Sequence, residues 1–166
     1  FKIGFTRIYD IFQKIGLSRY VVWIGSGKLG FPDRTIIAMA MGCDIIHIAR
    51  EAMLSIGCIQ AQKCHTGECP VGIATQNRWL EAGINVPLKA ERFKRYLESF
   101  RKELLAISHS AGYEHPCQFT AHDIEFSTGV NKFSSLDDVL HYRKDPSPFR
   151  SMVDLVKKFK KKKRRS

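Results

Sequence analysis

Residues 20–50 alternate short apolar runs with one segment of helical length, and this alternation constrains the fold more than any other feature. The run "RYVVWIGSG" is β-branched and aromatic and closes with glycines, as a buried parallel strand does. The next segment opens with proline and aspartate and ends before Gly42, which fits a helix of about ten residues. "DIIHIAR" then repeats the strand pattern. We therefore predict an α/β fold with adjacent parallel strands over 20–25 and 44–49, joined by a helix over 32–41.

Three further segments have the pattern of helices that serve as scaffold. "FTRIYDIFQKIG" places its apolar residues on one helical face and ends at Gly16. "SLDDVLHYR" predicts a short helix with Ser134 or Ser135 as its cap. Residues 88–111 form a long amphipathic pattern that ends at Gly112, and its apolar stripe comprises Phe93, Tyr96, Leu97, Phe100, Leu104, Ile107 and Ala111.

A glycine-rich turn, "IGSGKLG", directly follows the first predicted strand. Glycines let backbone N–H groups approach a ligand closely, so such a turn between a strand and a helix suits a phosphate group. A tight turn with no ligand explains the glycines equally well, because the common nucleotide-binding glycine patterns are absent. The second strand ends at Ala49 and Arg50, and phosphate sites of β/α barrels are often built by the loops after the last two strands. Lys28 is either a positive charge of this site or a solvated surface residue.

Three cysteines, Cys58, Cys64 and Cys69, lie in a segment of small and polar residues, "GCIQAQKCHTGECPVGIATQ". Steps of six and five residues turn a helix by about 240° and about 140°, so the thiols cannot share one helical face and we predict a wrapped loop. Three thiols suit a three-iron cluster, because two-iron and four-iron clusters normally take four cysteines. A zinc ion that also uses His65 is an alternative, although adjacent Cys64 and His65 are poorly placed for one ion. Structural cysteines without a ligand are another.

The formal net charge of +11 is concentrated near the end of the chain. Residues 157–165, "KKFKKKKRR", hold eight of the 27 lysines and arginines, whereas residues 1–150 carry 19 basic and 15 acidic side chains. Runs of like charge are usually solvated, so we predict that residues 157–166 are mobile. A basic nucleic-acid-binding protein is an alternative. It depends on this run alone, because no RNA-binding aromatic motif accompanies it.

Length and composition fit one globular domain, with 166 residues of which 44 % are apolar. The sequence contains neither an uninterrupted apolar stretch of about 18 residues nor a secretory signal. We therefore expect a cytoplasmic protein that does not interact with membranes. Because the chain starts at Phe1 rather than at a methionine, we also expect a fragment of a longer protein.

These motifs resemble, in the same order, the end of the FMN-binding domain of glutamate synthase large subunits. The resemblance is carried by "SGKLG", by "MGCDIIHIAREAMLSIGCIQAQKCHTGECPVGIATQ" and by "KAERF", and it extends from about residue 17 to about residue 125. It is specific because the Cys-x5-Cys-x4-Cys spacing is followed by Pro70, Gly72 and "ATQ". Cys43 and Cys117 lie outside this motif.

The resemblance implies both cofactors and ligands. In that family the domain is a TIM-type (β/α)8 barrel with FMN at its carboxyl face and a [3Fe-4S] cluster beside it. By resemblance, Cys58, Cys64 and Cys69 bind the cluster, and the FMN phosphate is surrounded by Gly25, Ser26, Gly27, Ala49 and Arg50. Lys28 then lies near the flavin or its phosphate.

The resemblance also implies a reaction and a division of the chain. The family is an oxidoreductase that forms L-glutamate from 2-oxoglutarate and glutamine-derived ammonia, with electrons from a donor subunit or ferredoxin. A complete barrel takes about 250 residues, so this chain would hold only the last strands and would be inactive alone. The expected parts are the last β/α units over 1–57, the iron–sulfur loop over 58–76, a helical extension over 77–150 and a basic tail over 151–166.

Overall fold

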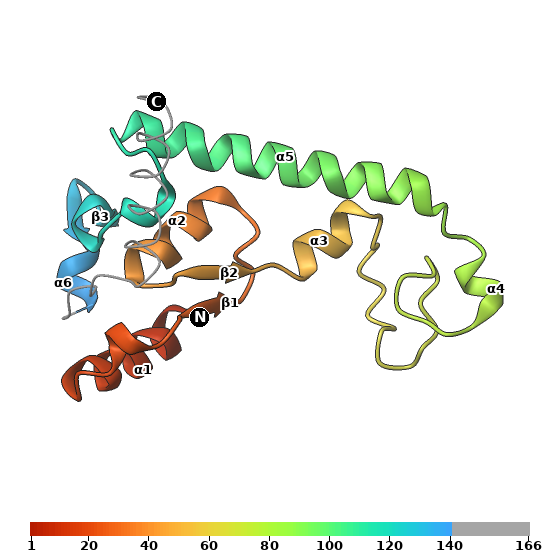
Figure 1. Ribbon diagram of the computed structural model, residues 1–166, viewed down its shortest axis with the longest axis horizontal. Coiled ribbons are helices and arrows are strands. Elements are labelled where there is room, and N and C mark those ends of the chain that lie inside the picture. The colour runs from red at the N-terminus through yellow and green to blue at the C-terminus, as the bar shows by residue number, and fades with distance from the viewer. Residues whose placement is uncertain (141–166) are drawn as a thin grey trace, which may run out of the picture.

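The computed structural model describes residues 1–140, so the basic tail and its predicted mobility lie outside the described residues. The described part is a mixed helix and strand structure that is drawn out along one long helix (Figure 1). Its α-helices and strands are α1 Lys2–Lys14, β1 Ile24–Ser26, α2 Pro32–Met41, β2 Ile45–His47, α3 Arg50–Ser55, α4 Arg78–Glu81, α5 Val86–Ser110, β3 Glu125–Gly129, β4 Lys132–Ser135 and α6 Leu136–Leu140. Short 3₁₀ turns occupy Ser18–Tyr20, Pro116–Gln118 and Ala121–Asp123.

The predicted strand–helix–strand unit is confirmed. β1 and β2 pair in parallel, with Ile24 opposite Ile45 and Ser26 opposite His47, and α2 connects them. This arrangement is consistent with a piece of a β/α barrel, although residues 1–140 contain only these two parallel strands.

Each strand has three residues, so both are shorter than predicted. Trp23 explains the late start of β1. Its backbone N–H donates to the Asp44 carboxylate at 2.8 Å, and its carbonyl oxygen accepts from the backbone N–H groups of both Asp44 and Ile45. A side chain therefore takes the place of a ladder hydrogen bond, and regular pairing begins only at Ile24.

The core lies where α1, α2 and the second half of α5 meet the last segments of the described chain. It consists of Tyr9, Ile36, Ala40, Met41, Leu104, Phe119, Ala121, Leu136 and Leu140. On α1, Phe5 and Tyr9 stack, and the Trp23 ring lies 4.8 Å from the Tyr9 ring between their centroids. The predicted helix over residues 5–15 is thus confirmed, and its apolar face is a packing surface.

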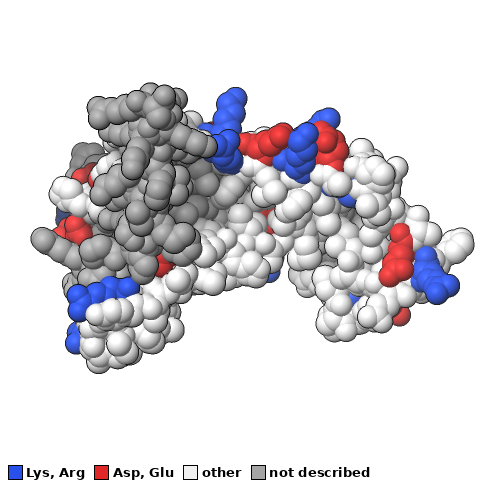
Figure 2. Space-filling view, in the orientation of Figure 1, with Lys and Arg blue, Asp and Glu red and all other residues white. Residues whose placement is uncertain are grey.

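Helix α5 bridges the core and the cysteine segment (Figure 1). It contacts α2 and α3, and its exposed charges include Glu91, which pairs with Lys94 and Arg95. Figure 2 shows acidic and basic side chains side by side along this edge of the molecule. The predicted apolar stripe is confirmed only in part: Leu104 is buried, whereas Leu97 is 42 % exposed. None of the helices in the described part is long and apolar enough to cross a membrane.

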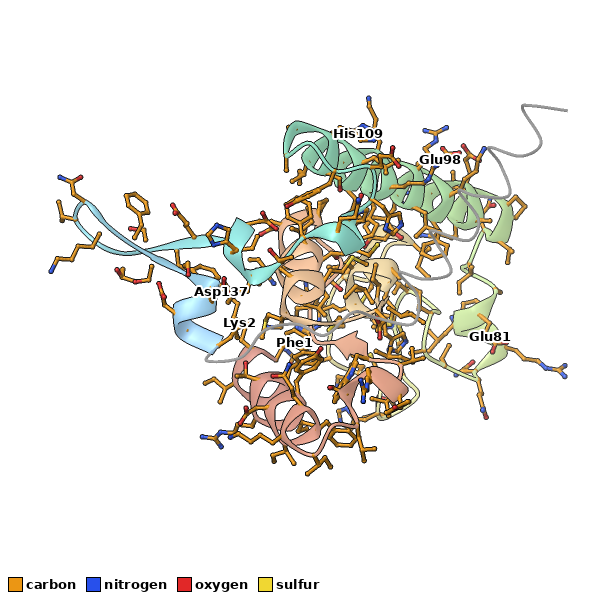
Figure 3. The ribbon with its side chains drawn as sticks, turned by 60° about the vertical axis from the view of Figure 1, so that its left-hand side comes forward. Phe1, Lys2, Glu81, Glu98, His109 and Asp137 are labelled. Atoms are coloured by element: carbon orange, nitrogen blue, oxygen red, sulfur yellow. The ribbon has the colours of Figure 1, made fainter. Side chains whose placement is uncertain are left out.

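The hairpin of β3 and β4 is an element that the sequence pattern did not predict. Its tip carries Val130, which is 92 % exposed, and the hairpin extends away from the body (Figure 3). Asn131 takes the left-handed conformation with φ 55°, so the turn is made without the usual Asn-Gly signal. Ser135 caps α6 as predicted, because its hydroxyl oxygen accepts from the Asp138 N–H at 3.3 Å.

Candidate cofactor site

The parallel pairing brings the two predicted phosphate segments together. Since β1 and β2 run in the same direction and in register, their carboxyl ends lie at one edge of the sheet. Gly27 and Lys28 follow β1 at this edge, and Ala49 and Arg50 follow β2. The residues that were predicted from two separate motifs thus lie on neighbouring loops.

Two glycines of the turn have different tasks. Gly25 lies within β1 and is buried, and a Cβ at this position would be 2.7 Å from the Cys43 Sγ atom. It therefore permits close packing between β1 and the segment that leads into β2. Gly27 lies in the turn itself with φ 142°, a backbone conformation that side chains disfavour. Cys43, which lies outside the cysteine motif, is a core residue.

The loops at this edge are exposed and carry two cations. Ser26 at the end of β1, Gly27 and Lys28 after it, and Ala49 and Arg50 after β2 are all exposed. Because Gly27 has no side chain, its exposed surface is backbone. The guanidinium of Arg34 donates to the Lys28 carbonyl at 3.4 Å and holds the turn against α2. Accessible backbone and two cations are the chemistry that an anionic phosphate group requires.

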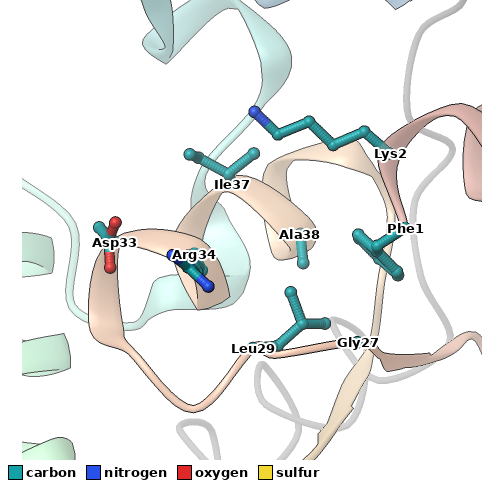
Figure 4. Close-up of a pocket in the computed structure, with 8 residues that line it drawn as sticks. All are labelled: Phe1, Lys2, Gly27, Leu29, Asp33, Arg34, Ile37 and Ala38. Atoms are coloured by element: carbon teal, nitrogen blue, oxygen red, sulfur yellow. The ribbon is translucent and has the colours of Figure 1, made fainter.

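A cleft of about 290 Å³ lies beside the turn, between the start of α1 and α2 (Figure 4). Gly27 is the one predicted phosphate residue among those that line it, and the Phe1 side chain lies 3.2 Å from the place where a Gly27 Cβ would be. The cleft is lined by Phe1, Lys2, Gly27, Leu29, Asp33, Arg34, Ile37 and Ala38. It therefore lies against α2, and neither Lys28 nor Arg50 lines it.

The cysteine segment is a wrapped loop, as predicted. Residues 56–77, between α3 and α4, contain neither helix nor strand. The chain reverses through backbone positions with positive φ, which are Gly57, Gln60, Gln62, Gly67 and Gly72. Replacing Gly72 by any other residue would force the backbone to move, because a Cβ there would be 2.4 Å from the Leu80 carbonyl oxygen.

Cys69 has the surroundings of a thiolate ligand. The thiol is buried, and the backbone N–H of Ala74, together with those of residues 71–73, points at its sulfur. These N–H groups lower the pKa of Cys69 against the opposing effect of burial. Since a metal binds the deprotonated form, this part of the loop fits a cluster ligand.

The other two thiols are less enclosed. Cys58 is half-buried, and its sulfur accepts from the Gln60 N–H at 3.4 Å, whereas Cys64 is exposed. Within residues 1–140 no three His, Cys, Asp or Glu side chains form a group that could hold a metal ion, so neither the three cysteines nor the zinc alternative with His65 is an assembled site there. In a three-iron cluster each thiolate binds a different iron, so its sulfurs stand further apart than the ligands of a single ion. The loop offers three thiols, one of which has a lowered pKa, and this donor chemistry is what a three-iron cluster requires.

Sequence reasoning missed the part that α5 plays beside both halves of the site. The Tyr96 hydroxyl donates to the carbonyl of Gly30, the last residue of the glycine turn, at 2.8 Å. The Lys89 ammonium lies against Gly57, which directly precedes Cys58, at 2.5 Å from the position of a Cβ. No sequence signal pointed to these contacts, because α5 is far from both segments along the chain.

The comparison with known families decides where this arrangement belongs. A model of the conserved region in glutamate synthase matches residues 1–114, which include the loops after β1 and β2 and the cysteine loop. The chain belongs to the glutamate synthase family. This is an oxidoreductase family, so the resemblance seen in the sequence motifs is confirmed.

Individual members of the glutamate synthase family agree with this assignment. The chain is 33 % identical over 131 residues to the glutamate synthase large subunit-like protein YerD of Bacillus subtilis, covering 79 % of this chain and 25 % of that protein. It is 31 % identical over 114 residues to the ferredoxin-dependent glutamate synthase of Pyropia yezoensis, covering 68 % of this chain and 7 % of that protein. With the archaeal NADPH glutamate synthase of Archaeoglobus fulgidus it shares 37 % identity over 67 residues, 40 % of this chain and 13 % of that protein. The chain thus spans a quarter or less of these relatives.

Proposed function

We propose that this chain is the part of a glutamate synthase that holds the phosphate of FMN and binds a [3Fe-4S] cluster. The complete enzyme forms L-glutamate from 2-oxoglutarate and glutamine-derived ammonia. In this proposal residues 1–57 are the last β/α units of a TIM-type barrel, 58–76 are the cluster loop, and the helices from residue 77 are a supporting extension. When bound, the flavin supplies hydride chemistry and the cluster supplies single-electron transfer.

The parallel pairing of β1 and β2 is the observation that carries the proposal. It gives one sheet edge a glycine turn with exposed backbone and a neighbouring loop with Arg50. The cysteine loop follows in the chain directly after α3, which starts at Arg50. The short helix α3 therefore connects the sheet edge proposed for the phosphate to the cysteine loop. This connection supports the proposal that the two cofactors are held near each other.

The residues of the chain have separate tasks in this proposal. Arg50 and Lys28 offset the charge of the phosphate, while the turn at Gly27 donates backbone N–H groups. Cys58, Cys64 and Cys69 bind the irons, and the N–H groups around Cys69 lower the pKa of its thiol and so favour the form that binds iron. None of the five cysteines, all of which lie in the described part of the chain, forms a disulfide, and this supports a reducing compartment such as the cytoplasm. The names of two relatives support either ferredoxin or an NADPH-dependent donor as the electron source.

The FMN part of the proposal is tested by Arg50→Gln in the holoenzyme. Removing a charged hydrogen-bond donor from a phosphate is expected to weaken FMN binding about 10- to 100-fold. The measurement is a titration of flavin-stripped protein with FMN, followed by flavin fluorescence, together with glutamate formation from 2-oxoglutarate and glutamine. Arg95→Gln is the matched control, because this arginine is on the outer face of α5 and pairs with Glu91 at 3.0 Å. A holoenzyme that binds no flavin would contradict the proposal.

A further inference from the structure

Tyr96 makes a contact that joins the middle of α5 to the end of the glycine turn. Its hydroxyl donates to the Gly30 carbonyl oxygen at 2.8 Å, across 66 positions of sequence. The ring is partly buried and stacks between Phe93 and Phe100, at centroid distances of 6.3 and 6.0 Å. The hydroxyl therefore has a polar task beyond the packing of the ring.

Glu51 meets the same point from a third element. It lies in the first turn of α3, next to Arg50, and is only 7 % exposed. A Cβ at Gly30 would lie 2.6 Å from the Glu51 Cβ and 2.7 Å from the Tyr96 hydroxyl oxygen. The end of the turn, the start of α3 and the middle of α5 are thus in direct contact at Gly30.

The exposed part of the turn depends on its two ends for its position. Ser26, Gly27 and Lys28 are exposed and contribute no side chain to the core. At one end Gly25 is fixed against Cys43, and at the other the Leu29 carbonyl accepts from the Thr35 hydroxyl at 2.5 Å. Those contacts tie the turn to α2 and to the segment that follows it, whereas Glu51 brings it against α3, which carries Arg50, and Tyr96 ties it to α5.

The Tyr96 hydroxyl is protonated at neutral pH, as that of an ordinary tyrosine is, and its surroundings shift its pKa further in this direction. Burial raises the pKa of Tyr96 above its ordinary value, and the negative charge of Glu51 raises this pKa further. The hydroxyl therefore remains a hydrogen-bond donor at neutral pH, which its contact with a carbonyl oxygen requires.

We propose that Tyr96 is a positioning residue that sets the distance between the glycine turn and Arg50, and thereby the affinity for the phosphate of FMN. This inference rests on the proposed function. Without the hydroxyl, the Gly30 carbonyl loses its partner and the turn shifts relative to the start of α3. The backbone N–H groups and the guanidinium then no longer converge on one phosphate, while the contacts of the flavin ring are unaffected.

The test compares FMN with riboflavin, which has the same ring system and no phosphate. The complete enzyme with Tyr96→Phe is stripped of flavin and titrated by fluorescence. The substitution is expected to weaken FMN binding about tenfold and to leave riboflavin binding unchanged. Tyr113→Phe is the matched control, because it removes a hydroxyl that donates to Asp123 at 2.8 Å and should alter neither affinity. Gly30→Ala is a second variant that forces Glu51 and Tyr96 away from the turn, and it should also weaken FMN selectively.

Each other outcome overturns the inference. If Tyr96→Phe binds FMN as tightly as the parent protein, Tyr96 does not position the turn, while the proposed function stands. If Tyr96→Phe weakens FMN and riboflavin equally, the residue has a general structural effect instead. If the parent protein binds no FMN, the proposed function fails together with this inference.

Discussion

Replacing Cys64 by alanine is expected to abolish the iron–sulfur cluster and to leave FMN bound. The loop offers three thiols, so the loss of one leaves an iron without its anionic ligand. Cys64 is exposed, so the substitution removes no core contact that could explain the loss by misfolding. Anaerobically purified parent protein should be brown, contain about three irons and about four sulfides, and show the electron paramagnetic resonance signal of a three-iron cluster. The variant should be yellow and lack this signal.

Cys117→Ala is the matched control for this experiment. Cys117 is half-buried and lies in the 3₁₀ turn Pro116–Gln118, outside the cysteine loop. Its replacement should leave the iron and sulfide contents unchanged. If Cys58→Ala, Cys64→Ala and Cys69→Ala all retain the full signal, the thiols do not bind a cluster. A colourless parent protein that contains zinc would instead favour the zinc alternative.

Helices α1, α2 and α5 and the parallel strands β1 and β2 were predictable because each has a local sequence signal. The proline at the start of α2 and Gly42 at its end mark a helix of the observed length, and the parallel pairing follows from short connections between apolar runs. The hairpin was not predictable in the same way. Its turn has Asn131 in the left-handed conformation without a following glycine, and its strands bury little apolar surface, so no alternating pattern develops.

The candidate site was predictable where its chemistry is continuous along the chain. The glycine turn, Arg50 and the three cysteines are all visible as short motifs with a physical rationale. The support from α5 was not visible, because Tyr96 reads as one member of an apolar stripe. Only tertiary packing shows that its hydroxyl reaches Gly30. The division of tasks between Gly25 and Gly27 also needed the structure, since both glycines look alike in sequence.

Gly42→Ala is expected to destabilise the protein by roughly 2–4 kcal/mol, which sums a left-handed backbone and a steric clash. Gly42 has φ 124°, and a Cβ there would be 2.7 Å from the Cε2 atom of Tyr9, a fully buried ring. The ring cannot move freely, because it also packs on Phe5 and Trp23. The melting temperature of the flavin-free protein, followed by circular dichroism, should fall by about 6–12 °C.

Gly112→Ala separates the two causes. Gly112 also has positive φ, 80°, but nothing lies within 4 Å of the position of its Cβ. Its replacement should therefore cost only the backbone strain of about 1–2 kcal/mol. Equal melting temperatures for the two variants would mean that Tyr9 moves aside without cost. If the clash occurs, its effect should also reach the candidate site. Gly42 directly precedes Cys43, and the Cys43 sulfur packs against Gly25 of the turn. FMN affinity should therefore fall in Gly42→Ala and not in Gly112→Ala.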